Sequence, residues 1–169
     1  MKSLIILMAL ALLTACSSTS PVSVNAVAGP PTNLTVEITE VSNTKGQMLV
    51  LLFDNSADYH SDKNVNDPDA HFFRKLVVAP TSPLTTVTFE SVPAGKYAIH
   101  VIHDEDSDGG MDRMIFPFTG MPSEPYALSN NIHDSFSKGD FEEALFTVKA
   151  PNTKIQLTLS THLSKVTGL

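Results

Sequence analysis

Hydrophobic and polar residues alternate along several short segments of this chain. Residues 34–39 read Leu-Thr-Val-Glu-Ile-Thr, with apolar side chains at even numbers only. Because successive side chains of a β-strand point to opposite faces, this alternation predicts a strand with one buried face. Residues 47–53 (QMLVLLF) form an apolar run, which is typical of a strand buried on both faces. The turn residues 43–46 between them predict that the two strands form a hairpin.

Five further segments carry strand patterns, each bounded by Pro, Gly or polar residues. They are residues 74–79, 85–92, 96–103, 144–149 and 154–160. The chain has no long segment with a helical apolar period, so we expect an all-β fold. The prediction is an antiparallel seven-stranded β-sandwich with immunoglobulin-like or transthyretin-like Greek-key wiring and one long loop. With no Trp and one Cys, the Cys-Trp-Cys pattern of antibody domains is missing.

The amino-terminal residues 1–15 have the three parts of an export signal. Lys2 supplies the positive charge, residues 4–13 are ten consecutive apolar residues, and small residues lead to Cys16. Ten apolar residues are too few to cross a bilayer core of about 30 Å. The ending Leu13-Thr14-Ala15-Cys16 resembles a bacterial lipoprotein signal, which implies acylation of Cys16 after cleavage. The alternative is an ordinary secretory signal that leaves Cys16 as a free thiol.

The resemblance to lipoproteins also implies a location. In such proteins of Gram-negative bacteria, Ser17 after the cysteine implies sorting to the outer membrane, where the domain would face the periplasm. Residues 16–33 then form the lipidated Cys and a flexible tether, and residues 34–169 form the folded domain. The whole chain has a net charge of −7, and removing Lys2 with the signal makes it −8. This acidity argues against a nucleic-acid partner and favours cations, the membrane anchor, and an envelope protein or polysaccharide.

Residues 104–112 (DEDSDGGMD) follow the order of a calcium-binding loop. Such loops supply oxygens at positions 1, 3, 5, 7 and 9 and need a glycine at position 6 for a sharp bend. In this chain the ligand positions are Asp104, Asp106, Asp108, the backbone carbonyl of Gly110, and Asp112, with Gly109 at the bend. An EF-hand closes with Glu at position 12, where this chain has Ile115. The pattern therefore predicts a calcium loop attached to a β-strand, and a plain acidic turn is the alternative.

The missing ligands have several possible sources. Residues 113–140 form a long segment without a clear strand, and its aromatic residues predict that it folds over one end of the sandwich. On that geometry we consider Glu124, Asn130 or Asn131 as additional ligands, together with Asp54 at the end of an earlier strand. The spacing does not choose among them.

Four segments carry a resemblance to a known family. They are KGQMLVLLFDNSADY, TVTFESVPAGKYAIHVIHDEDSDGGMD, EPYALSNN and FEEALFTV. In this order they are similar to the bacterial domain-of-unknown-function 2141 family over about residues 34–160. The resemblance implies an exported small β-sandwich whose polar loop corresponds to residues 103–112. It implies no activity.

An enzymatic alternative depends on His103 and Asp104, which would serve an envelope hydrolase. His100 and His103 differ by an odd number along one strand, so they point to opposite faces and cannot share a zinc ion. No nucleophile elbow, zinc-protease or phosphate-loop motif occurs in the sequence. We therefore expect a non-enzymatic protein. A further alternative is an adhesion or assembly module without metal, for which Phe116, Phe118, Met121 and Tyr126 are candidates if exposed.

Overall fold

The computed structural model describes residues 29–61, 63–116 and 119–168. The strands are β1 (Thr32–Thr39), β2 (Gln47–Phe53), β3 (Arg74–Val78), β4 (Thr85–Val92), β5 (Gly95–Asp104), β6 (Tyr126–Leu128), β7 (Phe146–Val148) and β8 (Asn152–Thr158). The helices are short: α1 (Ser56–Tyr59), the 3-10 turn η1 (Ser129–Asn131), α2 (Phe141–Ala144) and α3 (His162–Thr167). Within the described ranges, none of these helices has the length and apolar character needed to cross a bilayer.

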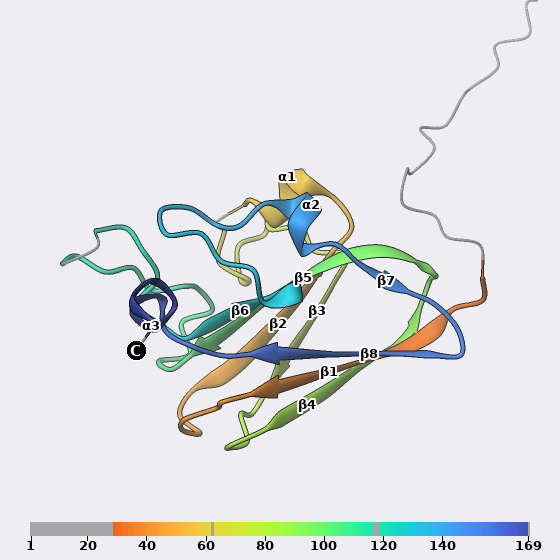
Figure 1. The fold of residues 1–169 in the computed structure, drawn as a ribbon, viewed down its shortest axis with the longest axis horizontal. Helices are drawn as coiled ribbons and strands as arrows, with labels where there is room; N and C mark the ends of the chain where they lie inside the picture. The colour runs from red at the N-terminus through yellow and green to blue at the C-terminus, as the bar shows by residue number, and fades with distance from the viewer. Residues whose placement is uncertain (1–28, 62, 117–118, 169) are drawn as a thin grey trace, which may run out of the picture.

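The strands form two sheets that face each other (Figure 1). One sheet has the order β4-β1-β8, and the other has the order β3-β2-β5-β6, with β7 paired to the first residues of β5. The mostly-β fold in two sheets agrees with the expected class. Two details differ from the expectation: the described residues contain eight strands, and β1 pairs with β8 in parallel. The additional strand, β6, has three residues, too few for a period to be visible in sequence.

The predicted hairpin of residues 34–39 and 47–53 is wrong, because β1 and β2 lie in different sheets. β1 pairs with β4 and β8, whereas β2 pairs with β3 and β5. The physical reason is the number of buried faces. β2 is buried on both faces, so it belongs in the larger sheet, which has a core on each side, while β1 keeps one face partly open and lies in the smaller sheet.

The space between the sheets is filled by the side chains that alternate inward. Leu34, Val36 and Ile38 are fully buried there, as their even spacing predicts. Other members of this core are Met48, Val50, Leu52, Val87, Phe89, Ile99, Val101 and Leu157. Each such side chain contributes about 1.5–3 kcal/mol by leaving water, which makes this layer the main source of stability.

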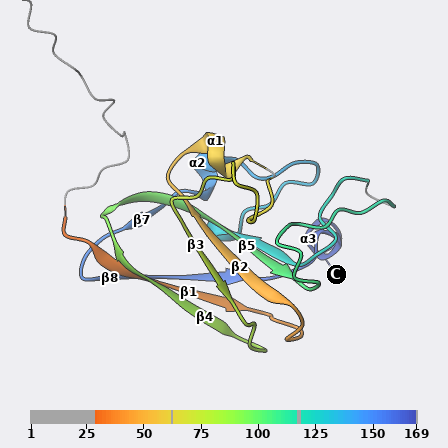
Figure 2. The same ribbon diagram turned by 180° about the vertical axis from the view of Figure 1, so that it is seen from behind.

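A second core covers the outer face of the larger sheet. Leu49 and Leu51 of β2 and Ile102 of β5 belong to this second core and not to the first. Figure 2 shows α1 and α2 at this face of the larger sheet. Tyr59, Phe141 and Ala144 from the two helices lie in the same cluster. The two faces of β2 and β5 therefore belong to different cores, so adjacent residues of these strands have different surroundings.

The chain leaves β5 at Asp104 and enters the acidic segment at one end of the sandwich. β6 pairs with the last part of β5, and α3 lies close to the same end, whereas β1 starts at the opposite end (Figure 1). The predicted export signal, Cys16 and most of the tether lie outside the described residues.

Candidate metal centre

The acidic segment is organised around Asp104, the last residue of β5, whose side chain is fully buried. Its Oδ1 accepts a hydrogen bond from the backbone N–H of Asp108 at 3.2 Å. Its Oδ2 accepts from the N–H of Gly109 at 2.8 Å and from Nε2 of Gln47 at 2.7 Å. The chain therefore curls around one carboxylate, because two backbone donors from the far side of the turn bind to it.

Three carboxyl groups converge within this curl. Asp104, Asp106 and Asp108 each offer an oxygen, and these oxygens lie within 4.8 Å of one another. Asp106 accepts from the N–H of Asp108 at 3.1 Å, and Asp108 accepts from the N–H of Gly110 at 2.7 Å. Ligands on opposite sides of a calcium ion are about 5 Å apart, twice the Ca–O distance. The three oxygens are thus close enough to share one ion.

The convergence has an electrostatic consequence at Asp106. The backbone N–H of Asp108 lowers the pKa of Asp106, but desolvation and the nearby carboxyl groups of Asp108, Asp104 and Asp112 together raise it. The net shift of the pKa is upward. A bound cation would remove this repulsion.

Glu124 braces the segment from the long loop. Its side chain is 7% exposed, Oε1 accepts from the N–H of Glu105 at 2.8 Å, and Oε2 accepts from the N–H of Asp112 at 3.1 Å. Desolvation raises the pKa of Glu124, its two backbone donors oppose this rise, and the charges of Asp104 and Asp112 add to it. Glu124 therefore lies next to the acidic segment, as the sequence predicts. Both of its carboxylate oxygens accept hydrogen bonds from backbone N–H groups of that segment.

The other proposed ligands lie in different positions. Asp112 is exposed and stands outside the group of three, although its charge reaches Asp106 and Glu124. Asp54 is excluded by register: Gln47 pairs with Asp104, and Phe53 pairs with Ala98. Asp54 follows Phe53, so it lies about 20 Å from Asp104 at the other end of β5.

The two asparagines of η1 are occupied at other places. Nδ2 of Asn130 donates to the carbonyls of Glu143 and Leu145, and Oδ1 of Asn131 accepts from the N–H of Thr158. They fasten the long loop to α2 and β8 rather than to the acidic segment.

Sequence reasoning missed the residues that support the segment from outside. Nδ2 of Asn64 donates to the carbonyl of Asp108 at 3.0 Å, and the N–H of Val65 donates to the carbonyl of Gly109 at 2.8 Å. Gly109 has φ +90°, and a Cβ there would lie 2.3 Å from Nδ2 of Asn66, so the predicted bend requires glycine. In the sequence, the polar and Asp-rich composition of residues 59–69 is typical of a loop, but it does not indicate which part of the chain that loop contacts.

The histidines of β5 point to different surroundings, as their spacing predicts. His103 is fully buried, and its Nε2 donates to the carbonyl of Lys45 at 2.9 Å. His100 is partly exposed on the opposite face and lines a pocket. Neither His103 nor Asp104 lines that pocket.

The proposed recognition patch is divided. Phe116 is 86% exposed and its neighbour Ile115 is 88% exposed, whereas Tyr126 is buried in the second core. Met121 is partly buried, and Phe118 lies outside the described residues.

Comparison with known proteins gives one clear match. The model of the family described as "Uncharacterized protein conserved in bacteria (DUF2141)" matches residues 36–156. No curated protein matches the sequence significantly. Among solved structures, a fimbrial assembly protein from Parabacteroides distasonis ATCC 8503 is similar at 10% identity and a TM-score of 0.36. The match covers 76% of this chain and 52% of that chain, so it spans about half of the fimbrial protein's length.

Proposed function

This chain belongs to the DUF2141 family of bacterial proteins, and from that premise we propose that it is a lipid-anchored, non-enzymatic module of the cell envelope that binds calcium. The observation that carries the metal proposal is the convergence of Asp104, Asp106 and Asp108 within 4.8 Å. The anchor proposal depends on the lipoprotein-like sequence that ends in Cys16.

Calcium suits the chemistry of these donors. All three are carboxylate oxygens, which are hard ligands of the kind that calcium prefers, and neither His nor Cys belongs to the group. In this proposal the side chains of Asp104, Asp106 and Asp108 bind the ion with the carbonyl of Gly110. Asp112 and Glu124 add negative charge nearby.

Calcium binding would make one end of the sandwich more rigid. Asp104 belongs to β5, Asn64 and Val65 come from the crossover between β2 and β3, and Glu124 comes from the long loop. An ion held by Asp104 to Asp108 would fix the segment that these three parts contact. The proposed role is therefore a rigid, calcium-dependent surface at the end of the domain where α3 lies.

The test is a thermal melt of the complete chain carrying Cys16→Ala, with calcium and with a chelator. Calcium at a hundredfold over its dissociation constant should stabilise the fold by about 2.7 kcal/mol. The double variant Asp106→Asn with Asp108→Asn should lose this effect. The matched control, Glu142→Gln with Glu143→Gln on α2, removes the same charge and should keep it. Identical melts with calcium and with chelator would contradict the metal proposal.

Location is tested separately by cell fractionation. Cys16→Ala should move the protein from the membrane fraction to the soluble fraction, and Ser18→Ala should leave it with the membrane. If the Cys16→Ala protein stays in the membrane fraction, the lipid anchor is wrong.

The two alternatives have less support. The hydrolase proposal requires His103 and Asp104 at an accessible site, but both side chains are fully buried. Of the candidates for the adhesion proposal, Phe116 is exposed, next to the exposed Ile115, but Tyr126 is buried. We therefore give the acidic segment the main role.

A further inference from the structure

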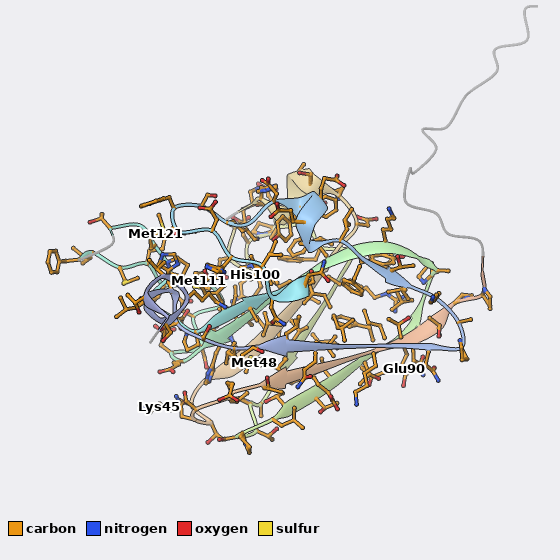
Figure 3. The ribbon with its side chains drawn as sticks, viewed as in Figure 1. Lys45, Met48, Glu90, His100, Met111 and Met121 are labelled. Atoms are coloured by element: carbon orange, nitrogen blue, oxygen red, sulfur yellow. The ribbon has the colours of Figure 1, made fainter. Side chains whose placement is uncertain are left out.

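A pocket of about 490 Å³ lies beside the acidic segment, on the outer face of the larger sheet. Its apolar lining includes Leu51 and Phe53 of β2, Phe72, Met111 and Tyr126. Figure 3 shows Met111 and Met121 on the same side of the molecule as His100. Pockets that bind small molecules measure about 300–1,000 Å³ and combine apolar walls with a few polar groups.

The charged side chains that line this pocket are mostly positive, although the protein as a whole is acidic. The whole chain carries a net charge of −7, yet the described residues that line the pocket include three cations, Lys63, Arg113 and Lys138, and one acid, Asp140. The ammonium of Lys63 lies 3.8 Å from the carboxylate of Asp69, so the positive charge of the pocket comes mainly from Arg113 and Lys138. A concave site with walls of low dielectric focuses such a local charge. The pocket therefore attracts anions, although the protein as a whole repels them.

His100 also lines this pocket, and the positive charges of the pocket affect its pKa. Burial lowers the pKa of His100 well below its ordinary value, and the charges of Lys138 and then Arg113 lower it further. Both cations thus act on one point in the pocket wall, although they come from separate parts of the long loop. His100 is neutral at pH 7, so its ring offers both a donor and an acceptor without adding charge.

Lys138 is held in a defined place. Its ammonium group donates to the carbonyl of Tyr59 and lies 4.4 Å from the ring centroid of Tyr59 and 5.4 Å from that of Phe53. Nη1 of Arg113 donates to the carbonyl of Gly120 at 2.8 Å. Because these contacts fix both groups before a ligand arrives, little side-chain entropy would be lost on binding.

We propose that this pocket binds a small organic monoanion with an apolar, preferably aromatic, body. The acidic head lies toward Lys138 and Arg113, and the body packs on Leu51, Phe72 and Tyr126. This site is distinct from the calcium site, and the proposal does not depend on calcium binding.

The test uses 8-anilinonaphthalene-1-sulfonate, an aromatic anion whose fluorescence rises in apolar surroundings. The complete chain carrying Cys16→Ala is titrated in chelator, so that the result is independent of calcium. Saturable binding of one probe molecule is expected, with displacement by 3-phenylpropionate. The matched alcohol, 3-phenylpropan-1-ol, has the same body without the charge and should displace the probe at least tenfold less effectively.

Variants then locate the site. Lys138→Gln and Arg113→Gln should each raise the dissociation constant about tenfold, the low end for one charge-assisted hydrogen bond. Lys96→Gln, an exposed lysine of β5 outside the pocket, should leave the constant unchanged. Each variant is checked by near-ultraviolet circular dichroism, because unfolded protein also binds the probe. The proposal is overturned if the probe does not saturate, if alcohol and acid displace it equally, or if both folded pocket variants bind like the original protein.

Discussion

Gly46 is the position where one added methyl group should most directly disturb the acidic segment. It lies just before β2 with φ +63°, and a Cβ there would be 2.0 Å from the carbonyl oxygen of Asp104 and 2.6 Å from the backbone of Glu105. A Cβ essentially never lies closer than 3.0 Å to such an atom, so the backbone at Asp104 must move by about 1 Å. Both clashing groups are backbone, which cannot rotate away.

The expected loss for Gly46→Ala has two parts. A residue with a Cβ in the left-handed region costs about 1–2 kcal/mol, and forcing packed atoms apart costs about 1–3 kcal/mol. The free energy of unfolding should therefore fall by about 2–5 kcal/mol, a large share of the 5–15 kcal/mol of an ordinary domain. Because the shift also moves Asp104, we expect the variant to lose most of its stabilisation by calcium.

Gly120→Ala is the matched control for this experiment. Gly120 has φ +83° but nothing within 4 Å of the position of a Cβ, so only the backbone conformation is penalised. Urea unfolding at equal m-values measures both variants, and Gly120→Ala should lose about 1–2 kcal/mol. If Gly46→Ala loses no more than Gly120→Ala, the close contact with Asp104 is not what requires glycine at residue 46.

Three further predictions follow from the same structure. Asp106→Asn should raise the melting temperature in chelator, since desolvation and the neighbouring carboxyl groups together raise the pKa of Asp106 and so disfavour its charged form. The same variant should have a lower melting temperature than the original chain in calcium, and a variant that is less stable in both conditions would contradict this prediction. Burial lowers the pKa of His100 in the folded state, so the unfolded chain binds the proton more tightly. The contribution of neutral His100 to the free energy of unfolding is therefore fully present above about pH 6.5 and decreases as the pH drops below that value. His100→Gln should flatten that decline in urea unfolding from pH 7 to 5, and an unchanged slope would refute it. Leu157→Ala removes a fully buried side chain between the sheets and should cost about 2–5 kcal/mol, whereas Leu163→Ala, 48% exposed, should stay within about 1 kcal/mol of the original chain.

The candidate site shows where local spacing was sufficient and where it was not. Asp104, Asp106 and Asp108 converge because backbone N–H groups within the same few residues bind their carboxylates, and such local bonds depend on sequence order alone. Glu124 lies beside the acidic segment because the loop that carries it returns to the same end of the sandwich. Asp54 is equally acidic, but the prediction that it is a ligand is wrong. The antiparallel register places the end of β2, where Asp54 follows, beside the start of β5, whereas Asp104 is the last residue of β5.

The mostly-β character, the buried faces of β1 and β2 and the bend at Gly109 could all be predicted from the order of residues, since each depends on periodicity or on one residue's allowed backbone angles. The pairing of β1 with β8, a parallel partner from the far end of the chain, rather than with its neighbour β2 became visible only in the folded domain. The same is true of the pocket that brings His100, Arg113 and Lys138 together. A hydrophobic period records which face of a strand is buried but carries no label for the partner that buries it. That choice is made by packing the whole domain at once, so pairings and pockets built from distant segments appear only when the chain is folded.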